Sequence, residues 1–416
     1  MLDVWPALPL SIVSHNDNPT GSVDNIIAAL KCTNRVCRIF LSIVRSFGLD
    51  ILLAEMQQPF PELTYLELSL GRETVPVFPD SFLGGSAPRL EWLQLYGISF
   101  PSLPKLLRSA THLVTLHLHQ IPHSGYFSPD AMATVLSTLT SLDSLSLSFE
   151  SHRFCPDPAN RRLSPSTCSA LPVLTVFLFK GVSEYLDDFV ACISAPQLNK
   201  LEITVFNDIE FYTPQFTQFI SRSTPVSRAP DKAHITFQDR AARVSFSSQT
   251  SRDWVFYLEI LCKGLDWQVS FLEHVCTSCL PLLYMLDDLY FHEDSDSQPD
   301  WEDNIESEEW LELLRPFKTV KNLYLSEKLA SCIATALRGP VEGRTTNVLP
   351  ALRNIFLKGL DSSGSVQESI RRFVAVRRVA NLPISISPWT NSTENIILRW
   401  TGTNRCTSFA TFRNDC

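Results

Sequence analysis

A frame of the form Leu-x-x-Leu-x-Leu, or a conservative version of it, recurs ten times along this chain of 416 residues. Seven copies follow one another, and they start at Val36, Leu63, Leu90, Leu113, Leu142, Leu174 and Leu198. Three further copies start at Leu286, Val320 and Leu352. The seven starts are separated by 27, 27, 23, 29, 32 and 24 residues. A chain with this regularity repeats one small structural unit, which limits its possible folds far more than its composition does.

The spacing of the frames is close to the period of leucine-rich repeats, which is roughly 20–29 residues. Segments with a helical spacing of apolar residues separate the frames, and they start near residues 22, 49, 129, 183, 214, 307 and 326. Units of one strand and one helix, stacked side by side, bury a continuous core and leave a long surface free. We therefore predict an α/β fold, a leucine-rich-repeat solenoid or horseshoe with parallel inner strands and outer helices.

The frames weaken between residues 203 and 286. Residues 233–237 and 242–246 alternate between apolar and polar side chains, which predicts a hairpin of two strands. Residues 255–261 predict another strand, and residues 267–280 predict a helix. We interpret this region as further repeats with degenerate frames, in preference to a second domain.

The predicted domain organisation is a single irregular leucine-rich-repeat domain over residues 1–389. Two segments interrupt its rhythm, a polar loop near residues 153–169 and an acidic loop near residues 293–309. Residues 390–416 show no repeat pattern, and we expect them to form a disordered tail.

The net charge of −9 is concentrated in one segment. Residues 287–312 hold twelve acidic side chains and no Lys or Arg, which leaves a net charge of +3 for the remainder. Without a strongly basic surface the chain lacks the electrostatic signature of a nucleic-acid-binding protein. No apolar run reaches the ~18 residues that a membrane helix needs. We therefore expect neither nucleic acid nor a membrane as a partner.

The cysteines and the start of the chain indicate an intracellular protein, cytoplasmic or nuclear. The eleven cysteines are odd in number and irregularly spaced, which is unlike a disulfide framework. The first residues lack a basic n-region and contain Pro6 and Pro9 where a signal helix would run.

Several longer strings of the sequence resemble the leucine-rich-repeat proteins of basidiomycete (mushroom-forming) fungi described as F-box-like or F-box domain-containing. These strings are residues 4–10 (VWPALPL), 59–64 (PFPELT), 80–90 (DSFLGGSAPRL), 109–114 (SATHLV), 121–126 (IPHSGY), 320–325 (VKNLYL) and 343–346 (GRTT). In that family an F-box docks a Skp1-type adaptor, and the repeats hold the protein to be ubiquitinated. The resemblance implies an alternative function, the substrate-recognition part of an SCF-type ubiquitin ligase receptor. No F-box opening of the form Leu-Pro-x-Glu precedes residue 4, so we expect the adaptor to bind only if an F-box lies upstream.

No set of residues in the sequence assembles a catalytic, cofactor or metal site. Cys276 and Cys279 form a Cys-x-x-Cys pair on a predicted helix, but a zinc or redox site needs further ligands that the sequence does not supply. His117 and His119 lie on the same face of a predicted strand and could begin a metal site or a metal-dependent hydrolase. The phosphate-binding, dinucleotide-binding and esterase motifs are absent. We predict a protein that is not an enzyme and that binds no cofactor or metal.

The positions beside the middle apolar residue of each frame are expected to point outward along the concave strand surface. Many of them hold side chains that are common in protein interfaces. The resulting candidate partner-binding residues are Phe40, Tyr65, Trp92, Tyr96, His117, His119, Tyr290, Tyr324 and Phe356. An alternative interpretation is that Tyr and Phe simply suit strands. We predict a non-enzymatic module that recognises a partner protein of unknown identity through this surface.

Overall fold

The computed structural model describes residues 8–15, 23–43, 49–70, 77–151, 168–206, 213–223, 230–248, 255–262, 264–278, 283, 285–294, 305–337, 348–358 and 364–389. The predicted polar loop lies almost wholly outside these residues, as does the predicted tail after residue 389. In the described part of the chain no helix is long and apolar enough to cross a membrane.

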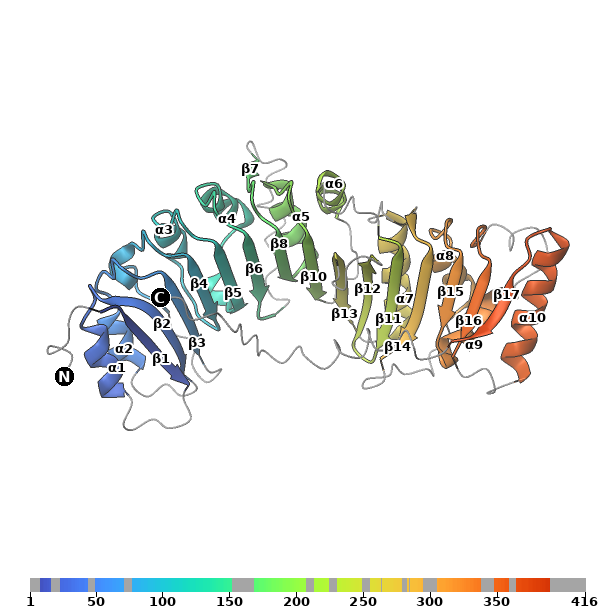
Figure 1. The fold of residues 1–416 in the computed structure, drawn as a ribbon, viewed down its shortest axis with the longest axis horizontal. Coiled ribbons are helices and arrows are strands. Elements are labelled where there is room, and N and C mark those ends of the chain that lie inside the picture. Colours follow the sequence, from blue (N-terminus) through green and yellow to red (C-terminus); the bar gives the residue numbers. More distant parts are fainter. Residues whose placement is uncertain are drawn as a thin grey trace.

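The described residues form an α/β structure built on one long sheet of fifteen strands, which extends along the whole length of the molecule (Figure 1). The first eight strands in spatial order are β1 (Leu10–His15), β2 (Val36–Ile43), β3 (Tyr65–Leu70), β4 (Trp92–Tyr96), β5 (Thr115–Ile121), β6 (Ser144–Phe149), β8 (Val176–Gly181) and β10 (Lys200–Phe206). Each of them pairs in parallel with the next. The last four strands, again parallel, are β14 (Asp288–Glu293), β15 (Asn322–Leu325), β16 (Asn354–Leu357) and β17 (Ser385–Pro388). The parallel strands expected from the frames are therefore confirmed.

Helices connect most of these strands and pack on one side of the sheet (Figure 1). They are α1 (Val23–Leu30), α2 (Leu49–Glu55), α3 (Leu103–Leu107), α4 (Pro129–Leu136), α5 (Ser183–Ala191), α6 (Pro214–Arg222), α7 (Leu265–Ser278), α8 (Ser307–Leu314), α9 (Glu327–Leu337) and α10 (Gly364–Val379). Short 3-10 turns, η1 (Phe82–Gly85) and η2 (His123–Gly125), and a small two-stranded sheet of β7 (Ser169–Ala170) and β9 (Ile193–Ser194) complete the connections. The helices expected near residues 22, 49, 129, 183, 214, 307 and 326 are all present.

The alternation of side chains along each strand places the core between sheet and helices. In β4, Leu93 and Leu95 are buried, whereas Trp92, Gln94 and Tyr96 are half-buried on the opposite face. The same alternation holds in neighbouring strands, because the strand register places equivalent positions of successive frames side by side. Leu66 pairs with Leu93, and Leu93 pairs with Leu116. The apolar positions of the frames therefore form continuous rows in one extended core.

The weak-frame region departs from the repeat. The predicted hairpin is present as β11 (Lys232–Gln238) and β12 (Ala241–Ser247), and β13 (Phe256–Leu261) follows. As the hairpin requires, β12 is antiparallel to β11, and it is also antiparallel to β13, so this region interrupts the parallel order of the other strands. The spatial order of the strands here is β10-β13-β12-β11-β14. On each side of this insertion the pairing is parallel, between β10 and β13 and between β11 and β14. A two-residue turn at Asp239 and Arg240 joins two strands that pair with each other, and this turn forces the antiparallel pairing.

The two ends of the predicted acidic loop lie in the described part of the chain. Glu293 ends β14, and Asp294 is buried and accepts a hydrogen bond from the side-chain amide of Gln238. At the other end, α8 begins at Ser307. Residues 295–304 lie outside the described part of the chain. Glu293 and Asp294, at the start of the predicted acidic loop, are therefore held at the end of β14 and by Gln238.

We predict that Leu116→Ala costs about 2–5 kcal/mol of unfolding free energy, because it leaves a cavity in a fully buried row. The matched control is Leu8→Ala, since Leu8 is 57% exposed and its truncation should change stability by less than about 0.5 kcal/mol. Urea unfolding followed by circular dichroism measures both. Equal costs for the two variants would contradict the placement of the core.

Candidate interaction surface

The face of the fifteen-stranded sheet that points away from the helices carries every residue predicted to contact a partner; we call it the open face. Phe40, Tyr65, Trp92, His117 and the other predicted residues occupy outward strand positions, as expected. The structure divides them into two groups, one on β2 to β5 and one on β14 to β16.

The first group consists of Phe40 and five residues that, together with Arg38, form the N-terminal aromatic patch. The patch is made of Arg38, Tyr65, Trp92, Tyr96, His117 and His119. The guanidinium carbon of Arg38 lies 4.2 Å from the centre of the Tyr65 ring. Tyr65 and Trp92 stack with centroids 5.5 Å apart and planes at 16°, and His117 meets Trp92 edge-on at 5.6 Å. His119 lies 5.6 Å from His117 and 6.2 Å from Tyr96. Three of these residues come from adjacent paired positions, because Arg38 pairs with Tyr65 and Tyr65 with Trp92.

Hydrogen bonds fix two side chains of the patch and leave one donor of the patch without a partner. The hydroxyl of Tyr65 donates to the Glu67 carboxylate, and burial together with this carboxylate raises the pKa of Tyr65 to about 12. His117 Nε2 lies 2.9 Å from Ser144 Oγ. The indole N–H of Trp92 is buried and has no hydrogen-bond partner among the described residues. A buried donor without a partner costs free energy, so the Trp92 N–H is an unsatisfied group at the base of the patch.

Burial keeps both histidines of the patch neutral near pH 7. It lowers the pKa of His117 to about 4, with a smaller contribution from the nearby His119. Burial also lowers the pKa of His119. Because both imidazoles are neutral, the guanidinium of Arg38 is the cationic group of the patch.

The second group is the C-terminal aromatic stack, made of His234, Tyr290, Tyr324 and Phe356. Successive rings lie 4.4, 4.1 and 4.4 Å apart and are nearly parallel, with interplanar angles of 4°, 10° and 8°. His234 belongs to the antiparallel insertion, and sequence reasoning did not select it.

Tyr290 is not the exposed contact residue that was predicted, because it is only 4% exposed. Rings stack on both of its faces. The indole of Trp389 is tilted against Tyr290 at a centroid distance of 6.0 Å and meets Tyr324 edge-on at 5.8 Å. Trp389 follows β17, and its backbone N–H donates to the Leu357 carbonyl at 2.8 Å. Tyr324 and Phe356 remain half-buried.

A row of polar side chains runs beside the stack. Asn322 donates to Asp288 at 2.6 Å, Asn354 donates to Asn322 at 2.7 Å, and Ser385 donates to Asn354 at 2.5 Å. Sequence reasoning did not select this row. The signal was present, since Asn322 and Asn354 hold the same position in consecutive frames.

A charged cluster separates the two aromatic groups. Arg243 of the antiparallel β12 lies 2.6 Å from the Glu259 carboxylate and donates to Gln238 at 2.8 Å. The hydroxyl of Tyr257 also donates to Glu259, at 3.1 Å. These groups satisfy one another, so the cluster resembles a structural network more than an open recognition site.

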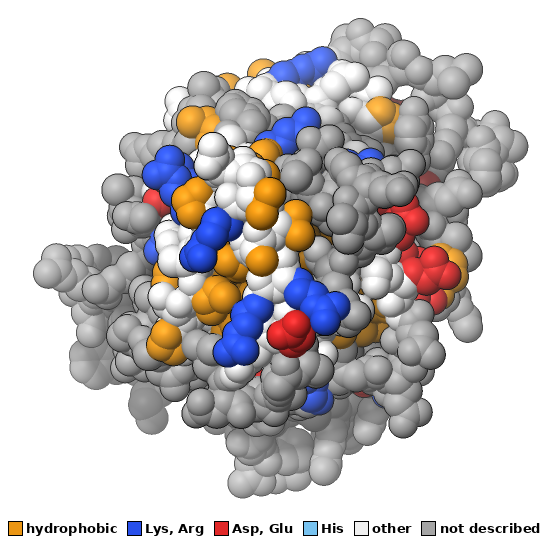
Figure 2. Space-filling view, turned by 90° about the vertical axis from the view of Figure 1, so that its right-hand side faces the viewer, with side chains coloured by type: hydrophobic (Ala, Val, Ile, Leu, Met, Phe, Trp, Pro, Cys, Tyr) orange, Lys and Arg blue, Asp and Glu red, His pale blue; other side chains and the backbone are white. Residues whose placement is uncertain are grey.

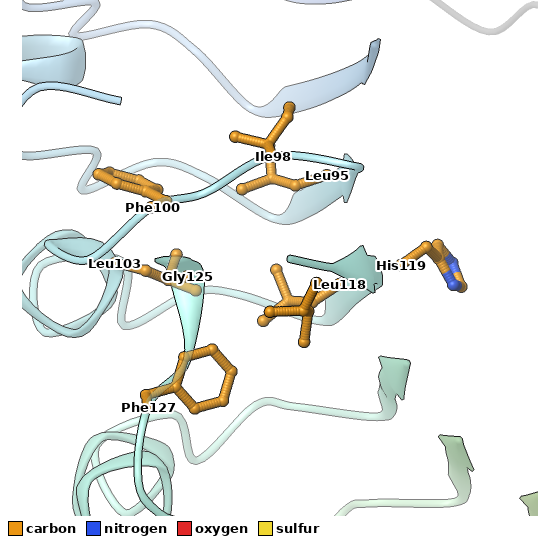
Figure 3. Close-up of a pocket in the computed structure, with 9 residues that line it drawn as sticks. Leu95, Ile98, Phe100, Leu103, Leu118, His119, Gly125 and Phe127 are labelled. Carbon is orange, nitrogen blue, oxygen red and sulfur yellow. The ribbon is translucent and has the colours of Figure 1, made fainter. Parts of the chain in front are cut away.

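Among the described residues, His117, His119 and Cys276 are the sequence candidates for a metal or redox site. The described residues contain no group of three or more His, Cys, Asp or Glu side chains that could hold a metal ion. Cys276 is buried on α7, and Cys279 lies outside the described part of the chain. A small pocket between sheet and helices, about 10 Å³ in volume, is lined mainly by apolar side chains such as Leu118 and Phe127, and His119 projects away from them (Figure 3). That volume is close to the space of one water molecule.

No protein-family model and no curated protein matches this chain. A solved structure with similarity to it is the leucine-rich repeat-containing protein LegL7 from Legionella pneumophila. The two chains share 12% sequence identity, and the superposition covers 88% of this chain and 97% of that one with a TM-score of 0.30.

We predict that stability falls as the pH is lowered from about 6.5 to about 4, because His117 binds a proton in the unfolded chain before it does so in the folded one. This histidine alone should account for about 2–3 kcal/mol of the loss. His117→Gln should reduce the fall in unfolding free energy over this pH window, whereas the exposed control His112→Gln should leave it unchanged. Urea unfolding at both ends of the window measures the effect. An identical fall in wild type and His117→Gln would refute the burial argument.

Proposed function

We propose that this protein is a leucine-rich-repeat horseshoe that binds another protein through the N-terminal aromatic patch of its concave face. One observation carries the proposal: Tyr65 and Trp92 stack beside Arg38 on adjacent strands and stay half-buried. Tyr, Trp and Arg are the residue types most enriched at the energetic centres of protein interfaces.

The patch is also preorganised, which supports a binding role. Its rings are held by stacking and by the hydrogen bonds of Tyr65 and His117, so little side-chain entropy remains to be lost on binding. The partner surface that fits it presents an apolar or aromatic side chain to the Tyr65–Trp92 stack and an acidic group to Arg38.

A non-enzymatic role without cofactor or metal remains part of the proposal. The support is that His117 and His119, the strongest candidates for chemistry, pack against aromatic neighbours, and His117 also contacts Ser144. The measurement that decides it is elemental analysis of the purified protein, in which stoichiometric zinc, iron or manganese would overturn this part.

The combined substitution Trp92→Ala and Tyr96→Ala tests the patch. Each residue that acts as a true hot spot should cost at least about 2 kcal/mol of binding free energy, or roughly thirtyfold in affinity. The partner is first captured by a photo-crosslinking amino acid at position 65, and its affinity is then measured by titration calorimetry.

The matched control is Trp267→Ala, which removes a 51% exposed tryptophan from the helix side of the molecule. Binding should be unaffected by this control. If the double variant folds as the wild type does and binds with unchanged affinity, the patch is not the interface.

The resemblance to F-box-like fungal proteins supports a second proposal, in which the bound protein is a ubiquitination substrate. This role requires an F-box, so the product translated from the full upstream reading frame should bind a purified Skp1-type adaptor. A chain starting at residue 8 is the negative control. Failure of the longer product to bind the adaptor removes the ligase role and leaves the aromatic patch untouched.

A further inference from the structure

The C-terminal end of the sheet exposes a surface that the open face does not include. It consists of the outward side of α10, the turn at residues 380–383 and β17; we call it the end surface. Figure 2 faces this end of the molecule and shows basic side chains interspersed with hydrophobic ones. The terminal unit of a repeat array usually presents a polar outer side that keeps the array soluble.

The apolar part of the end surface is unusually exposed for such a position. Val379 is 89% exposed, and Val376, Leu382 and Ile386 are 40%, 38% and 37% exposed. Val376 and Val379 are three residues apart on α10, so they lie on the same side of the helix. They form a short apolar stripe at the outer end of the array.

Basic side chains flank this stripe. Arg371 and Arg378 are exposed and have no ion-pair partner among the described residues. Arg372 is exposed as well, and it pairs with Glu368 at 3.0 Å. Such an exposed pair contributes little and can exchange partners. In a chain with a net charge of −9, the end surface therefore has the opposite sign to the whole.

Among the described residues no strand pairs with the outer edge of β17, and this edge does not favour the addition of another strand. Ser385 donates its N–H to Arg353 of the neighbouring segment at 2.9 Å, so the backbone groups of Ile386 and Pro388 point to the free edge. Pro388 has no N–H to offer there, and proline on an edge strand blocks pairing. Recognition at this end therefore relies on the side chains of α10.

We propose that the end surface docks an acidic amphipathic helix of another protein. Its apolar side covers Val376 and Val379, and its carboxylates pair with Arg371 and Arg378. A second copy of this chain in a two-fold arrangement fits poorly, because it would bring two surfaces of the same positive charge together.

A fluorescein-labelled helical peptide with a leucine stripe flanked by glutamates is the probe, and fluorescence anisotropy measures its binding to the full chain. The wild type should bind it with an affinity that falls as salt is added. The double variant Arg371→Glu and Arg378→Glu should bind at least about tenfold more weakly. Arg108→Glu, which reverses one exposed arginine near α3, should bind as the wild type does.

Two further variants separate a docking defect from misfolding. Arg371→Gln with Arg378→Gln keeps a helix-compatible side chain at both positions and should weaken the peptide in the same direction, with an unchanged circular dichroism spectrum. Val379→Ser removes the most exposed apolar group and should weaken binding without changing its salt dependence.

Several outcomes overturn the proposal. The proposal fails if the wild type does not bind the acidic peptide, or binds a lysine-flanked peptide equally well. It also fails if the Arg371→Glu and Arg378→Glu double variant binds the acidic peptide as the wild type does, or if the wild type prefers phosphatidylserine vesicles or duplex DNA to the peptide. Concentration-dependent dimers in ultracentrifugation that Val379→Ser abolishes would instead assign the surface to a second copy. Because Trp92 and Tyr96 lie outside the end surface, their double variant should bind the peptide normally, which keeps this test independent of the proposed function.

Discussion

Burial of the frame side chains in register across parallel strands is the constraint on which the rest of the structure depends. Leu66, Leu93 and Leu116 are fully buried and pair with one another through β3, β4 and β5. A shift by one residue in any strand would turn its apolar side chains to the open face. The same register therefore fixes the core and also decides which side chains meet on the other face, including the stack of Tyr65 on Trp92.

This constraint explains why much of the fold could be predicted from the sequence. The frames mark strands because their apolar positions have to be buried together. The intervening helices are marked by apolar residues at helical spacing on their buried faces. The outward direction of Trp92, Tyr96 and His117 follows from strand geometry alone. The hairpin of β11 and β12 was also predictable, since its strands lie next to each other in the sequence.

What the sequence could not provide depends on contacts between distant segments. The pairing of β10 with β13 skips two strands, and no local pattern encodes it. Tyr290 looks like an exposed strand residue until Trp389, from the far end of the domain, is placed over it. Arg377 carries a charged side chain, which from the sequence would be expected on the surface. It is only 1% exposed and donates to the carbonyls of Leu349 and Pro350, both at 3.1 Å. A buried arginine of this kind is stable only because those acceptors are already in place.

The two aromatic groups of the open face differ in a way that bears on function. Stacked aromatic pairs gain about 0.5–1.5 kcal/mol beyond the burial of their area, so both groups are stable features of the sheet. At the C-terminal stack the chain supplies its own cover, since Trp389 removes Tyr290 from solvent and leaves Tyr324 half-buried. At the N-terminal aromatic patch Tyr65, Trp92 and Tyr96 all remain half-buried, and the Trp92 N–H is left without an acceptor among the described residues. The indole of Trp389 packs over the C-terminal stack only, and this difference is the reason we propose the N-terminal aromatic patch as the part of the open face that contacts a partner.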